Sequence, residues 1–106
     1  MRKKYLLMVH LILLVSILVS ANAAQASPPS YAKWGQLAVK TAKEKYPRAN
    51  IVDYLHIGRE DKPHSAIEKF KLWVDDQGKE FGLLIQIEFD PKNDRVIQVN
   101  TQKTNN

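Results

Sequence analysis

The 106-residue sequence contains no cysteine. This absence excludes disulfide bonds, a catalytic thiol and a lipid-modified cysteine at a signal cleavage site. Small secreted domains commonly use disulfides to compensate for a small core, so this chain has to fold through side-chain packing alone. Serine is also scarce after position 26, where only Ser27, Ser30 and Ser65 occur. Few candidates for a hydroxyl nucleophile are therefore available.

Long apolar runs are limited to one, from Tyr5 to Val19, which follows three basic residues at positions 2–4 and precedes mostly small residues at positions 20–26. A basic start, an apolar segment of about 15 residues and an A-x-A site are typical of a secretory signal peptide, whereas a membrane-spanning helix needs roughly 20 apolar residues. We therefore predict that residues 1–26 are a signal peptide and that the protein is exported without a stable membrane anchor.

Two cleavage points fit the sequence, after Ala23 or after Ala26, and we prefer the second. Cleavage there leaves residues 27–106 as one domain of 80 residues, and 13 Lys and Arg remain against 11 Asp and Glu, so the net charge falls from +5 to +2. So small a charge does not favour nucleic-acid binding, which needs clustered cations. An exported, lysine-rich chain without disulfides suits the cell wall or medium of a Gram-positive bacterium.

Residues 31–46 have the period of an amphipathic helix, with Ser30 as the expected N-cap and Pro47 as the stop. At about 100° per residue, one apolar arc contains Tyr31, Trp34, Leu37, Ala38, Thr41, Ala42 and Tyr46. The opposite side carries Lys33, Gln36, Lys40, Lys43 and Glu44. We expect the apolar arc to face the core and the polar side to face solvent.

From Asn50 the hydrophobic period changes to two, which predicts a first strand that ends at Gly58. Two sets of side chains alternate in this strand: Ile51, Leu55 and Ile57 against Val52, Tyr54 and His56. The charged, proline-containing segment 59–64 then predicts an exposed loop before a second strand over residues 65–75.

The strongest turn signal is Asp76-Gln77-Gly78-Lys79, which lies between two alternating runs. A two-residue turn at Gln77 and Gly78 pairs large apolar residues on one face: Val74 with Phe81, Leu72 with Leu83 and Phe70 with Ile85. A slip of one residue would destroy this match. The same register sets Trp73 opposite Gly82 on the other face, where an aromatic ring can cover the glycine.

A second turn over residues 90–94 leads into a last strand from Arg95 to about Thr101, with Ile97 and Val99 inward and a frayed tail after it. These elements predict an α+β domain in which an N-terminal helix packs on one face of a three- to four-stranded antiparallel sheet. A single helix leaves the other face uncovered. That face should carry Lys69, Lys71, Trp73, Leu84, Gln86 and Val96.

The run from Ala38 to Val99 resembles a PepSY-type module, because residues 43–47 (KEKYP) close a helix and residues 87–97 (IEFDPKNDRVI) form a strand, a tight turn and a final strand. Asp94 stands where the PepSY turn commonly has glycine. The whole chain, with its leader, is similar to the small exported YqzG/YhdC proteins of Bacillus. This resemblance implies a fold and an extracellular compartment, and it implies that the module binds or restrains a secreted protease.

One cluster is a candidate metal site, formed by His56 and His64 with Asp53, Glu60 and Asp61 nearby in sequence. Two histidines on a strand and a loop do not supply the three or four converging ligands of a zinc site. A second set, Asp90, Asn93 and Asp94, fits a turn better than a calcium loop, because Pro91 interrupts it and a downstream acidic ligand is missing. We expect neither a metal nor another cofactor.

The candidate catalytic residues fit their possible roles no better than the candidate metal ligands do. Ser65 adjoins His64 in the chain, and such neighbours rarely place the base on the hydroxyl. The carboxylates Asp75 and Asp76 belong to the hairpin end, where turn formation explains them without a glycosidase role. We therefore expect a protein that is not an enzyme.

Three functional hypotheses follow. In the first, a partner protein docks on the uncovered sheet face at Trp73 and Leu84, flanked by Lys69, Lys71 and Gln86. In the second, an anionic wall polymer binds the helix lysines (Lys33, Lys40 and Lys43) and is released by salt. In the third, the sheets or edge strands of two copies form a homodimer.

Overall fold

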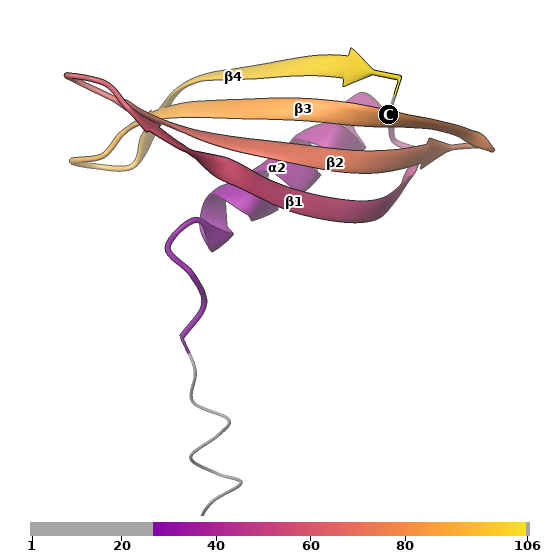
Figure 1. Cartoon of the computed structure of the whole chain (residues 1–106), viewed down its shortest axis with the longest axis horizontal. Helices are drawn as coiled ribbons and strands as arrows, with labels where there is room; N and C mark the ends of the chain where they lie inside the picture. Colours follow the sequence, from indigo (N-terminus) through magenta and orange to yellow (C-terminus); the bar gives the residue numbers. More distant parts are fainter. Residues whose placement is uncertain (1–26, 106) are drawn as a thin grey trace, which may run out of the picture.

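The computed structural model describes residues 27–105, which form one helix and one antiparallel sheet (Figure 1). The elements in chain order are α2 (Ala32–Lys45), β1 (Asn50–Asp61), β2 (Ala66–Asp76), β3 (Lys79–Asp90) and β4 (Arg95–Thr104). The strands lie in the order β1-β2-β3-β4, so each strand pairs with its neighbour in the chain. The predicted α+β fold is confirmed, with four strands in the sheet.

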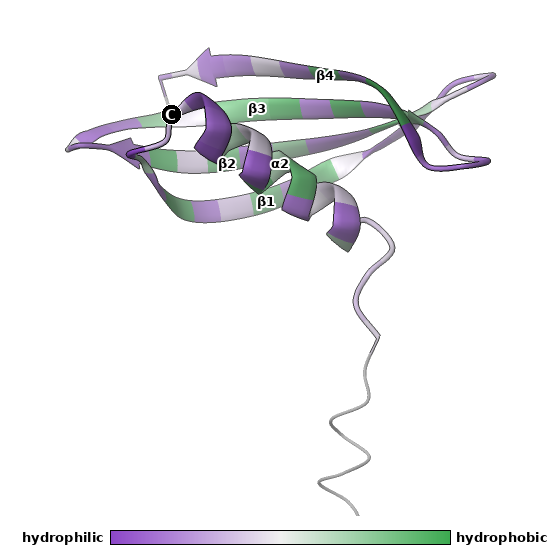
Figure 2. Ribbon diagram, turned by 180° about the vertical axis from the view of Figure 1, so that it is seen from behind, coloured by the Kyte–Doolittle hydropathy of each residue, from purple (hydrophilic) through white to green (hydrophobic). Residues whose placement is uncertain are grey.

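Helix α2 lies across one face of the sheet and buries the predicted apolar arc, with Trp34, Ala38 and Ala42 buried. The predicted polar side is exposed, and Figure 2 shows hydrophilic residues recurring along α2 between less polar ones. The prediction of Ser30 as the N-cap is wrong. Tyr31 occupies that position without a side-chain cap. Ser30 instead lies one residue earlier, inside a turn in which the Ala32 N–H donates to the Pro29 carbonyl at 3.0 Å.

The core lies between α2 and the facing side of β2 and β3, which we call the inner face. Its central side chains are Phe70, Leu72, Val74, Phe81, Leu83, Ile85, Ile87 and Phe89, all buried. Trp34 stacks on Phe89 with ring centroids 4.1 Å apart, which fixes the N-terminal half of α2 to the sheet. At the other end, Tyr46 meets Phe81 edge to face. Aromatic contacts therefore hold the helix at both ends.

The hairpin between β2 and β3 has the predicted register. Val74 lies opposite Phe81, Leu72 opposite Leu83, and Phe70 opposite Ile85. Gln77 and Gly78 have φ angles of 58° and 90°, the positive values that a two-residue type I′ hairpin turn requires. Turn geometry and apolar alternation thus specify the same pairing.

The prediction that the first strand ends at Gly58 is wrong, because β1 continues to Asp61 and pairs with β2 up to Ala66. The register shifts twice, between Ile51 and Asp53 and between His56 and Gly58. These bulges interrupt the alternation, so the apolar residues of β1 do not share one face. The charged end of β1 is compatible with a strand because β1 is an edge of the sheet.

The last strand also departs from the prediction. β4 extends to Thr104, which pairs with Gly82, so residues 102–104, predicted to be part of a frayed tail, belong to the strand. Val99 packs against the core as predicted. Ile97 was expected inward but is 49% exposed, because a bulge between the pairs of Glu88 and Phe89 leaves it outside the regular ladder. The predicted signal peptide, residues 1–26, lies outside the described residues.

Candidate functional site

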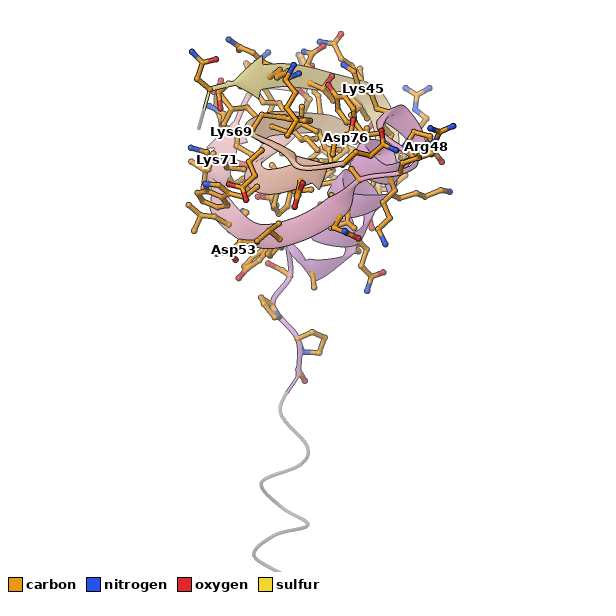
Figure 3. The ribbon with its side chains drawn as sticks, turned by 90° about the vertical axis from the view of Figure 1, so that its right-hand side faces the viewer. Lys45, Arg48, Asp53, Lys69, Lys71 and Asp76 are labelled. Atoms are coloured by element: carbon orange, nitrogen blue, oxygen red, sulfur yellow. The ribbon has the colours of Figure 1, made fainter. Side chains whose placement is uncertain are left out.

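The side of the sheet opposite α2, which we call the outer face, brings together the five residues predicted to bind a partner. Lys69 pairs with Gln86, Lys71 with Leu84, and Trp73 with Gly82. Figure 3 shows Lys69 and Lys71 pointing away from the helix. The expected member Val96 is not part of this face, because the bulge in β4 places it opposite the core residue Phe89.

Trp73 is half-buried on this face, and Gly82 opposite it is buried. No helix among the described residues covers this side, so a neighbouring side chain has to exclude solvent from Gly82. The cross-strand neighbours of Gly82 are Trp73 on β2 and Thr104 on β4, and the indole ring is the larger side chain that can cover it. The Lys71 ammonium lies 4.9 Å from the centroid of the Trp73 ring, a cation–π contact that positions both side chains. Trp73 therefore has a packing role and is still partly available to a ligand.

The two lysines of the outer face differ in electrostatic environment. Lys69 Nζ donates to Glu60 Oε1 at 2.9 Å, and this hydrogen bond, with the charge of Lys69, lowers the pKa of Glu60 below its usual range. Lys71 forms no ion pair within residues 27–105. It is thus the cation of this face that is open to an acidic group of a partner.

Leu55 is an outer-face residue that the sequence reasoning missed. It lies opposite Lys71 and is 50% exposed. Leu55, Lys71, Leu84 and Gln102 form one row across all four strands. The alternation in residues 50–58 had grouped Leu55 with Ile51, and only the bulge at Val52 separates them. The apolar part of the face is therefore wider than predicted.

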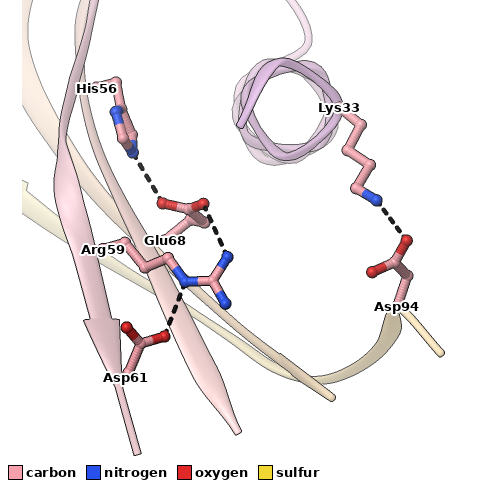
Figure 4. Close-up of polar contacts among 6 residues, drawn as sticks. All are labelled: Lys33, His56, Arg59, Asp61, Glu68 and Asp94. Carbon is pink, nitrogen blue, oxygen red and sulfur yellow. Dashed lines mark hydrogen bonds and ion pairs between the residues drawn. The ribbon is translucent and has the colours of Figure 1, made fainter. Parts of the chain in front are cut away.

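The three helix lysines proposed to bind an anionic polymer differ in whether they have a carboxylate partner. Lys33 forms an ion pair with Asp94 in the turn between β3 and β4 (Figure 4). Asp94 has a φ of 59°, the left-handed conformation for which glycine is the usual residue. Lys40 and Lys43 are exposed. Only two of the three cations proposed for an anionic polymer therefore lack a carboxylate partner in the described part of the chain.

A polar network within the core was also missed, and its centre is Glu68, which is 2% exposed. His56 Nε2 lies 2.8 Å from Glu68 Oε1, and Arg59 Nη1 lies 4.0 Å from Oε2 (Figure 4). Tyr31 stacks on His56 with ring centroids 3.7 Å apart. The buried carboxylate is thus partnered, as a buried charge must be. It joins β2 to β1, and the stacking of Tyr31 on His56 joins the start of α2 to β1. The alternation that places Phe70 and Leu72 inward could have indicated Glu68, but not its partners.

Next to this network, a groove of about 540 Å³ runs between α2 and β1, lined by Tyr31, Gly35, Val39 and Tyr54 among others. Gly35 permits this arrangement, because a Cβ there would lie 2.3 Å from the Tyr54 hydroxyl oxygen. Burial, followed by the charges of Tyr31 and Glu68, raises the pKa of Tyr54. The groove is mostly apolar, and it contains no group suited to bond-breaking chemistry.

The candidate metal ligands do not converge. No group of three or more His, Asp or Glu side chains within residues 27–105 is arranged to hold a metal ion. In the turn with Asp90, Asn93 and Asp94, two side-chain oxygens already accept hydrogen bonds from the backbone of the turn, Asp90 Oδ1 from the Lys92 N–H and Asn93 Oδ1 from the Arg95 N–H. Ser65 donates its hydroxyl hydrogen to Glu88 Oε2 at 2.6 Å, which ties the loop after β1 to β3.

Comparison with known proteins shows the family. A family described as "Protein of unknown function (DUF3889)" matches residues 11–103, most of the chain. The chain belongs to the DUF3889 family. Within residues 27–105, no helix has the length and hydropathy needed to cross a bilayer.

Two relatives of this DUF3889 protein come from Bacillus subtilis. It is 31% identical over 67 residues to "Uncharacterized protein YqzG" of strain 168, and the match spans 63% of this chain and 62% of that protein. An NMR structure of a protein from Bacillus subtilis is similar in fold, with a TM-score of 0.63 and 29% identity, and covers 76% of this chain and 90% of the other. The comparisons thus support the expected likeness to YqzG.

Proposed function

We propose that this DUF3889 protein is an exported, non-catalytic binding module that docks a secreted protein on the outer face of its sheet. The observation that carries the proposal is the composition of that face. Leu55, Trp73 and Leu84 are apolar but are only half-buried or exposed, whereas the apolar side chains of the inner face, such as Leu72, Leu83 and Ile85, are buried beneath α2. Side chains that add little to the core but resist solvation point to a contact with another molecule.

The kind of contact follows from the residue types. Aromatic side chains are enriched at the centre of protein interfaces, whereas charged residues are depleted there and lie at the rim. Trp73 and Leu84 occupy the middle of the outer face, and Lys69 and Glu60 lie beside them as a neutralised pair. Lys71 supplies one cation that has no carboxylate partner among residues 27–105. This arrangement suits a partner with an apolar surface and a nearby acidic group.

The partner class that we propose is a secreted protease, and the site of action is the cell wall or medium of a Gram-positive bacterium. Support comes from the signal-like composition of residues 1–26 and from the resemblance in sequence of residues 38–99 to PepSY-type modules. A binding role fits better than an enzymatic one, because Ser65 is engaged with Glu88 and the carboxylates Asp75 and Asp76 belong to the hairpin.

The two other hypotheses have less structural support. An anionic wall polymer would use the helix lysines, but Lys33 is already paired with Asp94. A dimer formed through the edge of β1 is disfavoured by the two bulges in that strand and by Asp53, whose Oδ1 accepts the Tyr54 N–H at 2.7 Å. Bulges and occupied backbone groups are devices that protect edge strands against pairing.

Site-specific photocrosslinking tests the proposal. A photoreactive residue placed at Gln86 on the outer face should capture a secreted protein from the native culture, while one placed at Gln36 on the exposed side of α2 should not. The captured protein is identified by mass spectrometry and purified, and its affinity is then measured directly.

Two substitutions locate the contact. Trp73→Ala and Leu84→Asp should each weaken binding of the purified partner at least about tenfold, the loss expected for a central interface residue. Circular dichroism checks that both variants are folded. Equal capture from Gln36 and Gln86, or undiminished affinity of both folded variants, would rule out the outer face. Loss of binding in a Lys33, Lys40 and Lys43 triple alanine variant, and by added salt, would support the polymer hypothesis instead.

A further inference from the structure

The two edge strands of the sheet differ in how well they are protected against pairing with another strand. Within residues 27–105, β1 and β4 each pair with one strand, so each leaves a row of backbone groups open. β1 is interrupted by two bulges and ends in charged residues. After its bulge at Ile97, β4 is regular from Gln98 to Thr104, a segment without proline in which Lys103 is the charged residue. Bulges, proline and charge are the usual protection of an edge, and this part of β4 has little of it.

The turn between β2 and β3 determines which backbone groups of β4 are open. A two-residue turn closes on a hydrogen-bonded pair, here Asp76 and Lys79, and hydrogen-bonded pairs then alternate with other pairs along an antiparallel ladder. The even-numbered residues of β3 therefore bond to β4, where their partners are the even-numbered residues of the regular segment. The N–H and C=O groups of Val99, Thr101 and Lys103 consequently point away from β3, toward the open edge.

These open groups are placed symmetrically about Thr101, the middle of the regular segment. A second copy of β4 that runs antiparallel to the first and is centred on Thr101 pairs all of them. In this register Thr101 lies opposite Thr101 of the second copy, and Val99 lies opposite Lys103 of the second copy. Like charges do not face each other, and the bulged Ile97 lies outside the paired segment at both ends. The segment is thus complementary to itself, as a two-fold interface requires, and this favours a second copy over an unrelated strand.

We infer that the protein forms a two-fold symmetric dimer in which β4 pairs with β4 of a second copy, so that the two sheets join into one. Helix α2 does not obstruct this contact, because it packs on β1, β2 and β3. Lys45 reaches the Thr101 hydroxyl from the inner face and leaves the backbone of Thr101 open. The two-fold axis is perpendicular to the sheet, so the outer faces of both copies lie on the same side. The inference does not rest on the proposed docking of a protein at Trp73.

Two measurements on the ¹⁵N-labelled protein, expressed from the full-length gene, test the dimer. Sedimentation velocity should show conversion of monomer to dimer as the concentration rises from about 50 µM to about 1 mM, the range of weak specific association. Over the same range, hydrogen exchange at the amides of Val99, Thr101 and Lys103 should slow several-fold, because pairing follows mass action. The amides of Asn100 and Gln102, which already bond to β3, should exchange at the same rate at both concentrations.

Proline at position 101 separates the dimer from the fold. Thr101→Pro removes an N–H that points to the open edge, and an edge strand tolerates proline where its nitrogen faces solvent. The variant should remain folded by circular dichroism and dimerise at least about tenfold more weakly, since the central pair loses its hydrogen bonds. Thr101→Val is the matched control, because it removes the hydroxyl that accepts a hydrogen bond from Lys45 but keeps the N–H. It should dimerise within about twofold of the wild type. Lys103→Pro, at the next open position, serves as the second variant if Thr101→Pro does not fold.

Four results would overturn the inference. The first is a wild-type protein that remains monomeric at about 1 mM. The second is hydrogen exchange at Val99, Thr101 and Lys103 that does not depend on concentration. The third is unchanged dimerisation of a folded proline variant, which would place the contact elsewhere. The fourth is protection of these amides only when a captured secreted protein is added, which would assign the edge to a strand of that protein. Capture through Trp73 is measured independently, so failure of the dimer leaves the proposed docking intact.

Discussion

The inner and outer faces of the sheet use adjacent residues of the same strands for different purposes. On the inner face Leu83 and Ile85 are completely buried beneath α2, while Leu84 between them lies half-buried on the outer face. The carboxylate of Glu68 on the inner face is buried and interacts with His56, whereas the carboxylate of Glu60 on the outer face is exposed and pairs with Lys69. Burial of apolar side chains is therefore concentrated on the inner face, and we expect most of the stability to come from it. The other face is consequently free to carry residues suited to contact.

The largest expected effect comes from the two adjacent leucines of β3. Leu83→Ala should lower the free energy of unfolding by about 2–5 kcal/mol, because it removes a buried side chain and leaves a cavity. Leu84→Ala should cost less than about 1 kcal/mol, since Leu84 is half-buried. Urea denaturation followed by circular dichroism measures both. Equal losses would show that the two faces contribute alike and would remove the basis for assigning contact to the outer one.

A second comparison uses the two carboxylates. Glu68→Ala should destabilise by about 1–3 kcal/mol, because it removes a buried hydrogen-bonded group and leaves His56 without its partner. Glu60→Ala should leave the free energy of unfolding close to the wild-type value, since its ion pair with Lys69 is exposed to solvent. If Glu68→Ala were as stable as Glu60→Ala, the network that joins His56 to Glu68 would have no structural role.

The sequence predicts the inner face well because its signals are local. Gln77 and Gly78 define a turn that allows one register, and the apolar residues at alternate positions on both sides of the turn agree with it. The position of α2 follows for the same reason, since the period of Trp34, Ala38 and Ala42 is helical and all three are buried.

The edge strands were predicted less well because their pairing depends on bulges. The bulge positions Val52, Ile57 and Ile97 are β-branched residues with no sequence feature that marks them as irregular. Each bulge changes which side chains share a face. As a result, Leu55 was not assigned to the outer face and Val96 was assigned there wrongly. Glu68 could be placed inward by alternation, but its contact with His56 requires the register of β1.

A third prediction concerns Tyr54, which lies on the inner face of the edge strand β1. Burial raises the pKa of its hydroxyl group. A group whose pKa is raised in the folded state stabilises the fold at pH values below its ordinary pKa of about 10, and this contribution is lost as the pH rises through the folded value. Tyrosinate absorbance during alkaline titration should therefore show a late step that Tyr54→Phe removes. Persistence of this step in the folded variant would contradict the packing of Tyr54 against α2.

The smallest effect belongs to the outer face, where a hydrogen bond from Lys69 lowers the pKa of Glu60. A lowered carboxyl pKa contributes to stability at neutral pH, and this contribution is lost as the pH falls through the folded value. Titration of the Glu60 carboxyl carbon by NMR should thus give a pKa below the ordinary glutamate range, and Lys69→Ala should return it to that range. Lys71→Ala is the matched control, because its ammonium lies on the Trp73 ring rather than on a carboxylate. An equal rise of the Glu60 pKa in both variants would mean that both lysines lower this pKa through long-range charge and not through one hydrogen bond. Lys71 could then no longer be singled out as the cation open to a partner.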